Sequence, residues 1–409
     1  MKILIVNKFL YPNGGSETYI FKLGDEFKRQ GHEVQYFGME HEGRCVGNSA
    51  EVYTSDMDFH TGKLGKLLYP FKIIYSKEAY VKITHVLDDF KPDVVHLNNF
   101  NFQLTPSVIY AVRDWEKKEA GRKVKLIYTA HDGQLVCPNH LMQQYITKER
   151  CVECIGGSPW KCAKHKCIHG SLVKSILGSV EASIYRHRRT YGLLDLVICP
   201  SEFLKKRLDS LPELRDKTIA MHNFVDAKLS GEATSLDDKE DYILYLGRFS
   251  EEKGVKTLLK AIKELNGEGR VLPFKFAGNG PLEDEVNSIP NIENLGFLTG
   301  DDLVNAIKKA KFTIFPSECN ENCPFTVIES QIYGTPLIAA NVGGVAEVMK
   351  DGVTGDLFEP GDAKELKTKI VALYEDANRL KEYSENCGAM QFDDLGDYTT
   401  SFVEKISSL

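Results

Sequence analysis

Four charged residues in the second half of the chain have types and spacings that suit a phosphorylated, hydroxyl-bearing ligand. Glu321 and Glu329 lie in CNENCPFTVIES (319–330), and Arg248 and Lys253 lie in GRFSEEKG (247–254). Carboxylates accept hydrogen bonds from hydroxyl groups, whereas fixed cations hold phosphate oxygens and stabilise negative charge on a leaving group. From spacing alone, solvated surface charges are an equal alternative.

Pro324 separates the two glutamates. A proline disfavours the α conformation at the preceding Cys323 and fits the first turn of a helix. We therefore predict a helix over PFTVIESQIYG that ends at Gly334, with Glu321 in the loop before it and Glu329 in its body. The first amides of such a helix suit phosphate oxygens.

The elements that must position these residues form two blocks of alternating strands and helices. Strands are predicted at 2–7, 32–38, 92–99, 123–132 and 195–201, and then at 241–249, 273–281, 312–317 and 335–344. A polar linker, TSLDDKED, lies at the seam near 218–240. Such alternation builds doubly wound parallel sheets, in which ligands bind beyond the carboxyl ends of the strands. We therefore predict an α/β protein with two Rossmann-like sheets facing a central cleft.

A glycine pair follows the first predicted strand. Gly14 and Gly15, in NGGSE, open a helix and allow backbone N–H groups to approach an anion. A plain glycine turn is the alternative reading. The stretch is not a dinucleotide fingerprint, because the third glycine is absent.

Length and composition are typical of a two-domain globular protein. The chain has 409 residues, of which 42% are hydrophobic and 27% charged. No apolar run reaches the roughly 18 residues of a membrane span. The opening MKILIVNKFL is too short for a signal-peptide core, so we read it as the first strand of a cytoplasmic protein.

Charge is distributed unevenly along the chain. Residues 1–200 hold 27 Lys and Arg against 21 Asp and Glu, a net of +6, and the rest hold 24 against 37, a net of −13, which together give −7. A basic first half suggests an anionic partner such as a membrane face or a phosphorylated acceptor. Chance variation between domains is the alternative.

Several longer motifs together resemble the retaining glycosyltransferases of family 4, which have the GT-B fold. The second half carries GRFSEEKG, FAGNGP, LGFLTGDDL, PSECNENCPFTVIES and GTPLIAANVGGVAEVMKDGVTGDLFEPGD. The first half carries GGSE, GHEV, TAHD and CPSEF, followed by HNFVD at 222–226, all in the family's order. The resemblance covers nearly the whole chain. One departure is Asn322-Cys323-Pro324-Phe325, where many members have a Gly-Phe-Gly run, and it bears on which donor sugar fits.

The resemblance implies a division of the chain into domains and roles for its site residues. It implies an acceptor-binding domain at 1–222 with a cysteine-rich insertion at 137–169, a nucleotide-sugar-binding domain at 223–388, and a C-terminal helix at 389–409 that returns to the first domain. Arg248 and Lys253 are expected to bind the donor diphosphate, Glu321 the transferred sugar and Glu329 the ribose. Expected ligand contacts from both domains are those of Gly14, Gly15, His131, Gly278, Asn279, Phe297, Leu298, Cys323, Pro324, Phe325 and Thr326. His131 is placed near the transferred sugar, and Phe297 and Leu298 with Gly278 and Asn279 in the base pocket.

A cysteine cluster follows the TAHD motif. Five of the ten cysteines lie within 137–167, and Cys151, Cys154, Cys162 and Cys167 form two pairs around a short Gly/Pro loop. A cytoplasmic setting argues against disulfides, and two such pairs can form a tetrahedral zinc site. Unmetallated thiols that pack the insertion are the alternative. The position after His131 suggests that the insertion helps to define the acceptor.

Two segments of the first half combine basic and apolar residues. They are 61–83, with five lysines, and 171–194, which ends in an arginine cluster. Either can lie on an anionic membrane surface, and a charged outer face on a core helix is the alternative.

The resemblance implies a retaining hexosyltransferase without a catalytic metal. Its donor would be a UDP- or GDP-linked sugar and its acceptor a lipid-linked glycan or polysaccharide, in cell-surface polysaccharide biosynthesis at the inner face of the membrane. No nucleic-acid partner is expected. The rival hypotheses are another GT-B reaction, such as that of an epimerase or phosphorylase, and an inactive metal- or membrane-binding scaffold.

Overall fold

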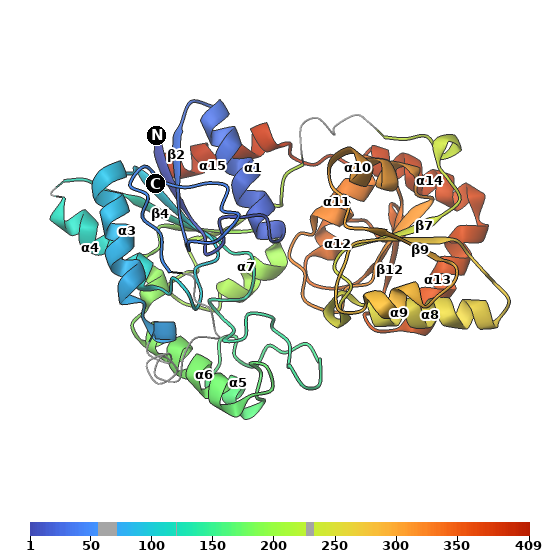
Figure 1. The fold of residues 1–409 in the computed structure, drawn as a ribbon, viewed down its shortest axis with the longest axis horizontal. Coiled ribbons are helices and arrows are strands. Elements are labelled where there is room, and N and C mark those ends of the chain that lie inside the picture. Colours follow the sequence, from blue (N-terminus) through green and yellow to red (C-terminus); the bar gives the residue numbers. More distant parts are fainter. Residues whose placement is uncertain (56–71, 120, 226–232) are drawn as a thin grey trace. The chain divides into compact units, whose positions relative to one another are not determined.

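The computed structural model describes residues 1–55, 72–119, 121–225 and 233–409. The chain divides into two compact units (Figure 1). Unit 1 comprises Met1–Met221 and Leu395–Leu409, and unit 2 comprises His222–Asp394. Residues 61–71 of the basic segment predicted at 61–83, together with the last residue of HNFVD, lie outside the described residues.

A six-stranded parallel sheet forms the centre of unit 1 in the described part of the chain. Its strand order is β2-β1-β3-β4-β5-β6, and the central strands are almost fully buried, which explains why they read as continuous apolar runs. The strands are β1 (Lys2–Val6), β2 (Glu33–Phe37), β3 (Val94–Leu97), β4 (Lys125–Thr129), β5 (Leu196–Cys199) and β6 (Thr218–Ala220).

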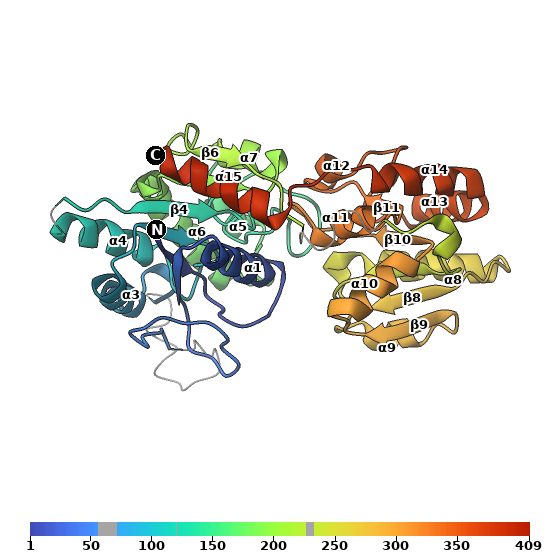
Figure 2. The same ribbon diagram turned by 90° about the horizontal axis from the view of Figure 1, so that it is seen from above.

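Helices cover both faces of this sheet (Figures 1 and 2). They are α1 (Gly15–Arg29), α3 (Lys77–Phe90), α4 (Ser107–Lys118), α5 (Trp160–Lys164), α6 (Leu172–His187) and α7 (Glu202–Leu208). The C-terminal α15 (Leu395–Ser407) lies beside α1, where the hydroxyl groups of Tyr19 and Tyr398 are 2.8 Å apart and the rings of Phe27 and Phe402 are 5.4 Å apart. The last helix of the chain is thus part of the first unit.

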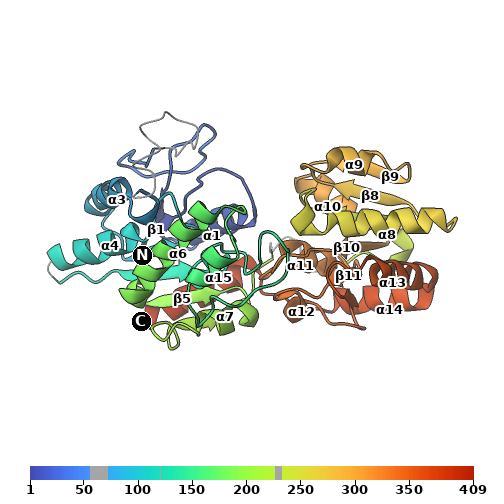
Figure 3. The ribbon, with the colours of Figure 1, turned by 90° about the horizontal axis from the view of Figure 1, so that it is seen from below.

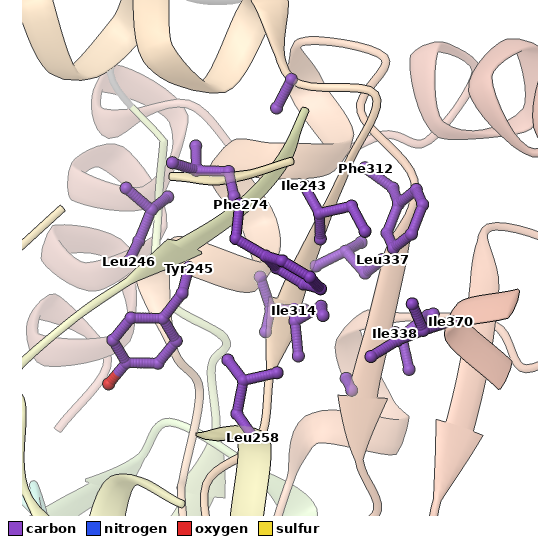
Figure 4. Close-up of a cluster of buried hydrophobic side chains, with 14 of the residues drawn as sticks. Ile243, Tyr245, Leu246, Leu258, Phe274, Phe312, Ile314, Leu337, Ile338 and Ile370 are labelled. Carbon is purple, nitrogen blue, oxygen red and sulfur yellow. The ribbon is translucent and has the colours of Figure 1, made fainter. Parts of the chain in front are cut away.

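Unit 2 repeats the plan with a second six-stranded parallel sheet among its described residues. The order is β12-β11-β10-β7-β8-β9. The strands are β7 (Ile243–Leu246), β8 (Phe274–Ala277), β9 (Ile292–Gly296), β10 (Phe312–Phe315), β11 (Leu337–Ala340) and β12 (Gly355–Phe358). Figure 4 shows side chains from β7, β8, β10 and β11 converging with Leu258 and Ile370 from the covering helices.

The helices of unit 2 are α8 (Val255–Gly267), α9 (Glu283–Asn287), α10 (Gly300–Lys309), α11 (Phe325–Ile332), α12 (Val345–Val348), α13 (Ala363–Glu375) and α14 (Ala377–Gly388). The polar linker predicted near 218–240 contributes a short 3₁₀ turn, Leu236–Asp238. None of the helices within the described ranges is both long and apolar enough to cross a bilayer.

The predicted strands all contain strands of the structure, whereas β6, β9 and β12 were not predicted. These three lie at sheet edges or carry glycine and polar residues, so their apolar signal is weak. The chain leaves unit 2 after Asp394 rather than at 388, because Val225 and Asp394 form a parallel bridge within unit 2.

Candidate functional site

The residues predicted to bind the donor lie along one edge of the unit 2 sheet. Arg248 follows β7, Asn279 follows β8, Phe297 follows β9 and Glu321 follows β10, and all these strands are parallel. The sequence order reverses between the adjacent strands β7 and β10. Ligands of doubly wound sheets bind at such a reversal, beyond the carboxyl ends of the strands. The residues predicted to bind the donor therefore lie where the topology of unit 2 favours a ligand.

Lys253 and Glu321 form the centre of this edge. The Lys253 ammonium lies 2.6 Å from Glu321 Oε1, which also accepts hydrogen bonds from Ser317 Oγ at 2.7 Å and Cys319 Sγ at 3.3 Å. The Glu321 side chain is 15% exposed and that of Lys253 35% exposed. A cation and a carboxylate that are 68 positions apart in sequence are thereby fixed beside one another at a partly open surface.

Two glycines make this arrangement possible. Gly254 has φ +70, and a Cβ there would lie 1.8 Å from the Pro316 carbonyl oxygen, so the turn carrying Lys253 packs directly on the loop after β10. Gly343 has φ +59, and a Cβ there would lie 1.8 Å from the Glu321 carbonyl oxygen. The neighbouring Gly344 N–H donates to that same oxygen at 2.8 Å. Only residues without a side chain allow these approaches.

The electrostatics of the pair follow from burial and proximity. Burial alone would raise the pKa of Glu321, but the Lys253 charge and the hydrogen bonds to the carboxylate outweigh it and lower that pKa. Burial would likewise lower the pKa of Lys253, and the Glu321 charge outweighs it and raises that pKa. Both groups are therefore ionised at neutral pH.

The loop before α11 ends as an N-cap at Pro324, which has an extended backbone, and the helix begins at Phe325. The predicted helix therefore starts one residue later, and Glu329 is its fifth residue and half-buried. Thr326, also half-buried, stands with Phe325 in the first turn, where amide groups have no acceptor within the helix.

The Cys323 side chain turns away from solvent. It is buried, its sulfur accepts a hydrogen bond from the Asn223 N–H at 3.2 Å, and the Asn223 side-chain amide donates to the Cys323 carbonyl at 2.7 Å. Burial raises the pKa of the Cys323 thiol to about 12. The thiol thus ties the loop before α11 to the start of unit 2.

The remaining residues predicted in unit 2 lie at strand ends. Arg248 is exposed, and its carbonyl accepts a hydrogen bond from the Tyr245 hydroxyl at 2.9 Å. Gly278 packs so closely on Gly247 that a Cβ would lie 1.9 Å from its carbonyl oxygen, while Asn279 is exposed. Phe297 is 73% exposed, and Leu298 packs against the core. An exposed phenyl ring beside a close glycine turn can stack on a flat aromatic base.

Unit 1 also has its predicted residues at the carboxyl edge of its sheet, where strand order reverses between β1 and β3. Gly14 is the extended N-cap of α1, and Gly15 is the first residue of that helix. His131 follows β4, and its Nε2 lies 2.8 Å from Asn98 Oδ1. Burial lowers the pKa of His131 to about 4, so the imidazole is neutral near pH 7.

Sequence reasoning missed several side chains that fix the predicted residues at the carboxyl edge of each sheet. Asn98 fixes His131, and Ser317 fixes Glu321. Glu17 is buried and accepts a hydrogen bond from the Asn7 side chain at 2.9 Å. A usable signal existed, because Asn7, Asn98 and Ser317 are polar residues directly or closely following buried parallel strands.

The cysteine-rich insertion was predicted to hold zinc between its two cysteine pairs. In the described residues, no group of three or more His, Cys, Asp or Glu side chains is placed to hold a metal ion, so the structure does not support a site made by Cys151, Cys154, Cys162 and Cys167. The four cysteines are free thiols, and they line one small cavity together with Cys137. Arg186 on α6 donates to the Cys154 carbonyl at 2.9 Å. The cysteines thus pack the insertion against α6.

Comparison with protein families identifies the chain. A model described as "Glycosyltransferase Family 4" matches residues 13–229, and one described as "Glycosyl transferases group 1" matches residues 228–389. The chain belongs to glycosyltransferase family 4. The two models overlap at residues 228–229, a few positions after unit 2 of this family 4 chain begins at His222.

Curated relatives of the family 4 chain come from several organisms. An uncharacterized glycosyltransferase of Methanocaldococcus jannaschii is 29% identical over 54% of this chain and 60% of its own length. The alpha-D-kanosaminyltransferase of Streptomyces kanamyceticus is 28% identical over 39% of this chain and 42% of its own length. An uncharacterized 42.6 kDa protein in the cps region of Klebsiella pneumoniae is 24% identical over 86% of this chain and 88% of its own length. The matched part thus spans less than two thirds of the first two relatives.

Solved structures resemble the family 4 chain along its whole length. Anabaena HepE in complex with UDP has a TM-score of 0.67 at 18% identity, with all of both chains covered. The lipopolysaccharide outer core galactosyltransferase WaaB has a TM-score of 0.62 at 17% identity, covering 100% of this chain and 98% of its own. At these identities the likeness shows the fold, which is GT-B.

Proposed function

We propose that this family 4 chain is a retaining glycosyltransferase. It moves a hexose-type sugar from a UDP- or GDP-linked donor to a lipid-linked glycan or polysaccharide acceptor, in cell-surface polysaccharide biosynthesis. The observation that carries the proposal is the Lys253–Glu321 pair, 2.6 Å apart at the strand-order reversal of unit 2.

The pair has the chemistry that a nucleotide-sugar donor requires. An ammonium group has three N–H donors, so Lys253 can keep one on Glu321 and direct the others at a diphosphate. With the exposed Arg248, it stabilises the negative charge that grows on the diphosphate as the sugar leaves. Glu321 keeps lone pairs for hydroxyl groups of the sugar, and Glu329 on α11 accepts from the ribose.

The remaining residues complete the proposed donor site. Gly278 and Asn279 with Phe297 and Leu298 form the base pocket, and the amides from Cys323 to Thr326 meet sugar or phosphate oxygens. In unit 1, Gly14 and Gly15 offer helix-start amides.

Retention of configuration needs no protein nucleophile if the leaving phosphate takes the acceptor proton. In that route the acceptor oxygen attacks the anomeric carbon from the face that the phosphate leaves, and the proton passes from the acceptor hydroxyl to a phosphate oxygen. Lys253 and Arg248 supply charge stabilisation, and the neutral His131 of unit 1 offers a hydrogen bond to the transferred sugar. No metal ion takes part in the proposed step.

The relatives support particular reagents for a first test. HepE binds UDP and UDP-glucose, and the Klebsiella relative lies in a cps region. The screen should therefore contain UDP, UDP-glucose, UDP-N-acetylglucosamine, GDP and GDP-mannose, with stabilisation against heat as the readout. We expect either the uridine or the guanosine compounds to raise the melting temperature. If no compound of the panel stabilises the protein, the donor assignment is refuted.

A reaction assay separates transfer from the rival activities. The donor that stabilises the chain is incubated with and without lipid-linked glycan acceptors, and the products are identified by mass and anomeric configuration. An α-linked product from an α-linked donor supports retention. Interconversion of the donor sugar without acceptor indicates an epimerase, and a sugar phosphate formed from glycan and phosphate indicates a phosphorylase.

A further inference from the structure

Exposed apolar side chains are concentrated in one small region of unit 1. Fourteen large hydrophobic residues in the described part of the chain are exposed, and eight of them fall between 141 and 176. The eight are Leu141, Tyr145, Ile146, Val152, Trp160, Leu172, Val173 and Ile176. Monomeric soluble proteins seldom gather exposed apolar groups in this way without a partner.

Two elements of this region meet and form a continuous surface. A hairpin closed by the antiparallel bridge of Gln143 and Arg150 carries Tyr145 and Ile146 towards its end. The Tyr145 ring lies 5.9 Å from the His169 ring, immediately before α6 begins. Figures 1 and 3 show α6 alongside α5 at the same side of unit 1. The hairpin thus borders the start of α6.

The first turns of α6 present an apolar face to solvent. Ile176 lies three positions after Val173 and four after Leu172, and all three are exposed, whereas Ser175 and Ser179 on the adjacent face are buried. Val173 is 76% exposed and Ile146 in the hairpin is 62% exposed. An amphipathic helix normally buries its apolar stripe, so this reversal indicates a face made for contact.

Basic residues surround these apolar side chains. Between 141 and 176 the chain has six Lys and Arg residues, all exposed, against the two acids Glu149 and Glu153. Glu153 already pairs with Lys161 and His165. Lys148 lies 4.6 Å above the Tyr145 ring, so cationic and aromatic groups are interleaved.

We propose that the hairpin and the start of α6 form a docking surface for an anionic phospholipid membrane. We name the surface by its apolar residues Tyr145, Ile146, Leu172, Val173 and Ile176. Aromatic and aliphatic side chains enter the interfacial layer, and the surrounding lysines meet lipid phosphates. The charge pattern favours lipid over a second copy of the chain, because two copies would bring like charges together. The inference does not depend on the proposed donor, since docking is measurable without catalysis.

Binding to vesicles tests the surface directly. The full-length protein is floated with phosphatidylcholine vesicles, with or without about one third phosphatidylglycerol. We expect binding to the anionic vesicles only, and loss of binding at high salt because exposed charges are screened. Equal binding to neutral vesicles, or none to anionic ones, would overturn the proposal.

Charge-reversed variants identify the lysines involved. The pair Lys148→Glu and Lys174→Glu should lower the vesicle partition coefficient by about fivefold or more per residue. The control pair Lys260→Glu and Lys350→Glu makes the same change in net charge at exposed positions of unit 2 and should leave binding nearly unchanged. Equal losses in both pairs would show that net charge alone attracts the protein, and would contradict a defined surface.

Apolar variants test insertion separately from attraction. Ile146→Ser with Val173→Ser should lower partition by about tenfold per residue, since each loses a buried aliphatic group. Val271→Ser with Val353→Ser, at exposed positions of unit 2, is the matched control. All variants should keep the parent melting temperature. A different outcome would assign the surface to a second copy of the chain. In that case the parent would not bind vesicles but would self-associate in sedimentation velocity, and the variant Ile146→Ser with Val173→Ser would lose that self-association.

Discussion

Replacing Gly343 by alanine should damage donor binding by moving Glu321. The added Cβ would lie 1.8 Å from the Glu321 carbonyl oxygen, whereas ordinary contact begins at 3.4 Å, so the backbone must move apart by about 3.4 − 1.8 = 1.6 Å. The left-handed backbone adds a conformational cost of about 1–2 kcal/mol, and overpacking adds about 1–3 kcal/mol. We therefore expect a loss of about 2–5 kcal/mol in the free energy of unfolding.

The same shift should lower activity more than stability alone explains. Misplacement of a site residue by about 1 Å can cost about 100-fold in rate. The movement of Glu321 also pulls its carboxylate from Lys253, which it holds at 2.6 Å. Donor affinity should be measured by calorimetry, and turnover by nucleotide release, both at a temperature where the variant is fully folded.

Gly269→Ala provides a matched control. Gly269 has φ +79, and no atom lies within 4 Å of a Cβ built there, so the substitution carries the backbone cost alone. It follows the C-terminal end of α8, whereas Lys253 precedes the N-terminal end of that helix. We expect a loss of about 1–2 kcal/mol and normal donor affinity. If the two variants bind the donor equally well, Gly343 does not position Glu321 for the ligand and the reasoning is wrong.

Three further predictions concern the site and its surroundings. Lys253→Met should lower turnover about 100- to 1,000-fold because the leaving diphosphate loses a cation. The control Lys256→Met removes an exposed ion pair with Glu251 and should leave turnover unchanged. Equal effects of the two substitutions on turnover would refute the role of Lys253. His96 is fully buried, and its pKa is lowered to about 3, mainly by burial and further by the nearby His131. Below pH 6.5 this histidine therefore binds a proton in the unfolded chain but not in the folded chain. Stability should therefore fall as pH drops from about 6.5 towards 3, and His96→Gln should flatten that part of a plot of urea midpoint against pH. Cys323→Ser should keep donor affinity, because a hydroxyl can still accept from the Asn223 N–H; a large loss would show that the thiol meets the ligand.

The sequence alone was sufficient to predict the chain's overall organisation. Buried parallel strands such as β1, β4 and β10 are continuous apolar runs followed by turn residues, so their period and boundaries are visible without a structure. Pro324 marked the loop before α11, and the glutamates before and within that helix followed from its position. Edge strands such as β6, with three residues, carry too few side chains to show a pattern.

The spacing of cysteines was a poor guide to their arrangement. Two Cys pairs predicted a zinc site because sequence spacing shows only which residues are near in the chain. In the folded insertion the cysteines are free thiols around one small cavity, and Arg186, from a helix further along the chain, donates to the Cys154 carbonyl. The groups that each thiol contacts depend on tertiary packing, which cannot be inferred from the spacing of cysteines in the sequence.

The sequence by itself determined which chemistry is present, and the tertiary structure decided which groups act together. Residue types placed an acid at 321 and a cation at 253, but 68 positions separate them. They meet because β7 and β10 are neighbours in a parallel sheet, and because Gly254 and Gly343 let three loops approach to backbone contact. For the segment 171–194 the sequence left a membrane surface and a core helix as alternatives, because the two kinds of helix have the same apolar period and differ only in what covers them. The structure shows that the first turns of α6 expose their apolar side chains.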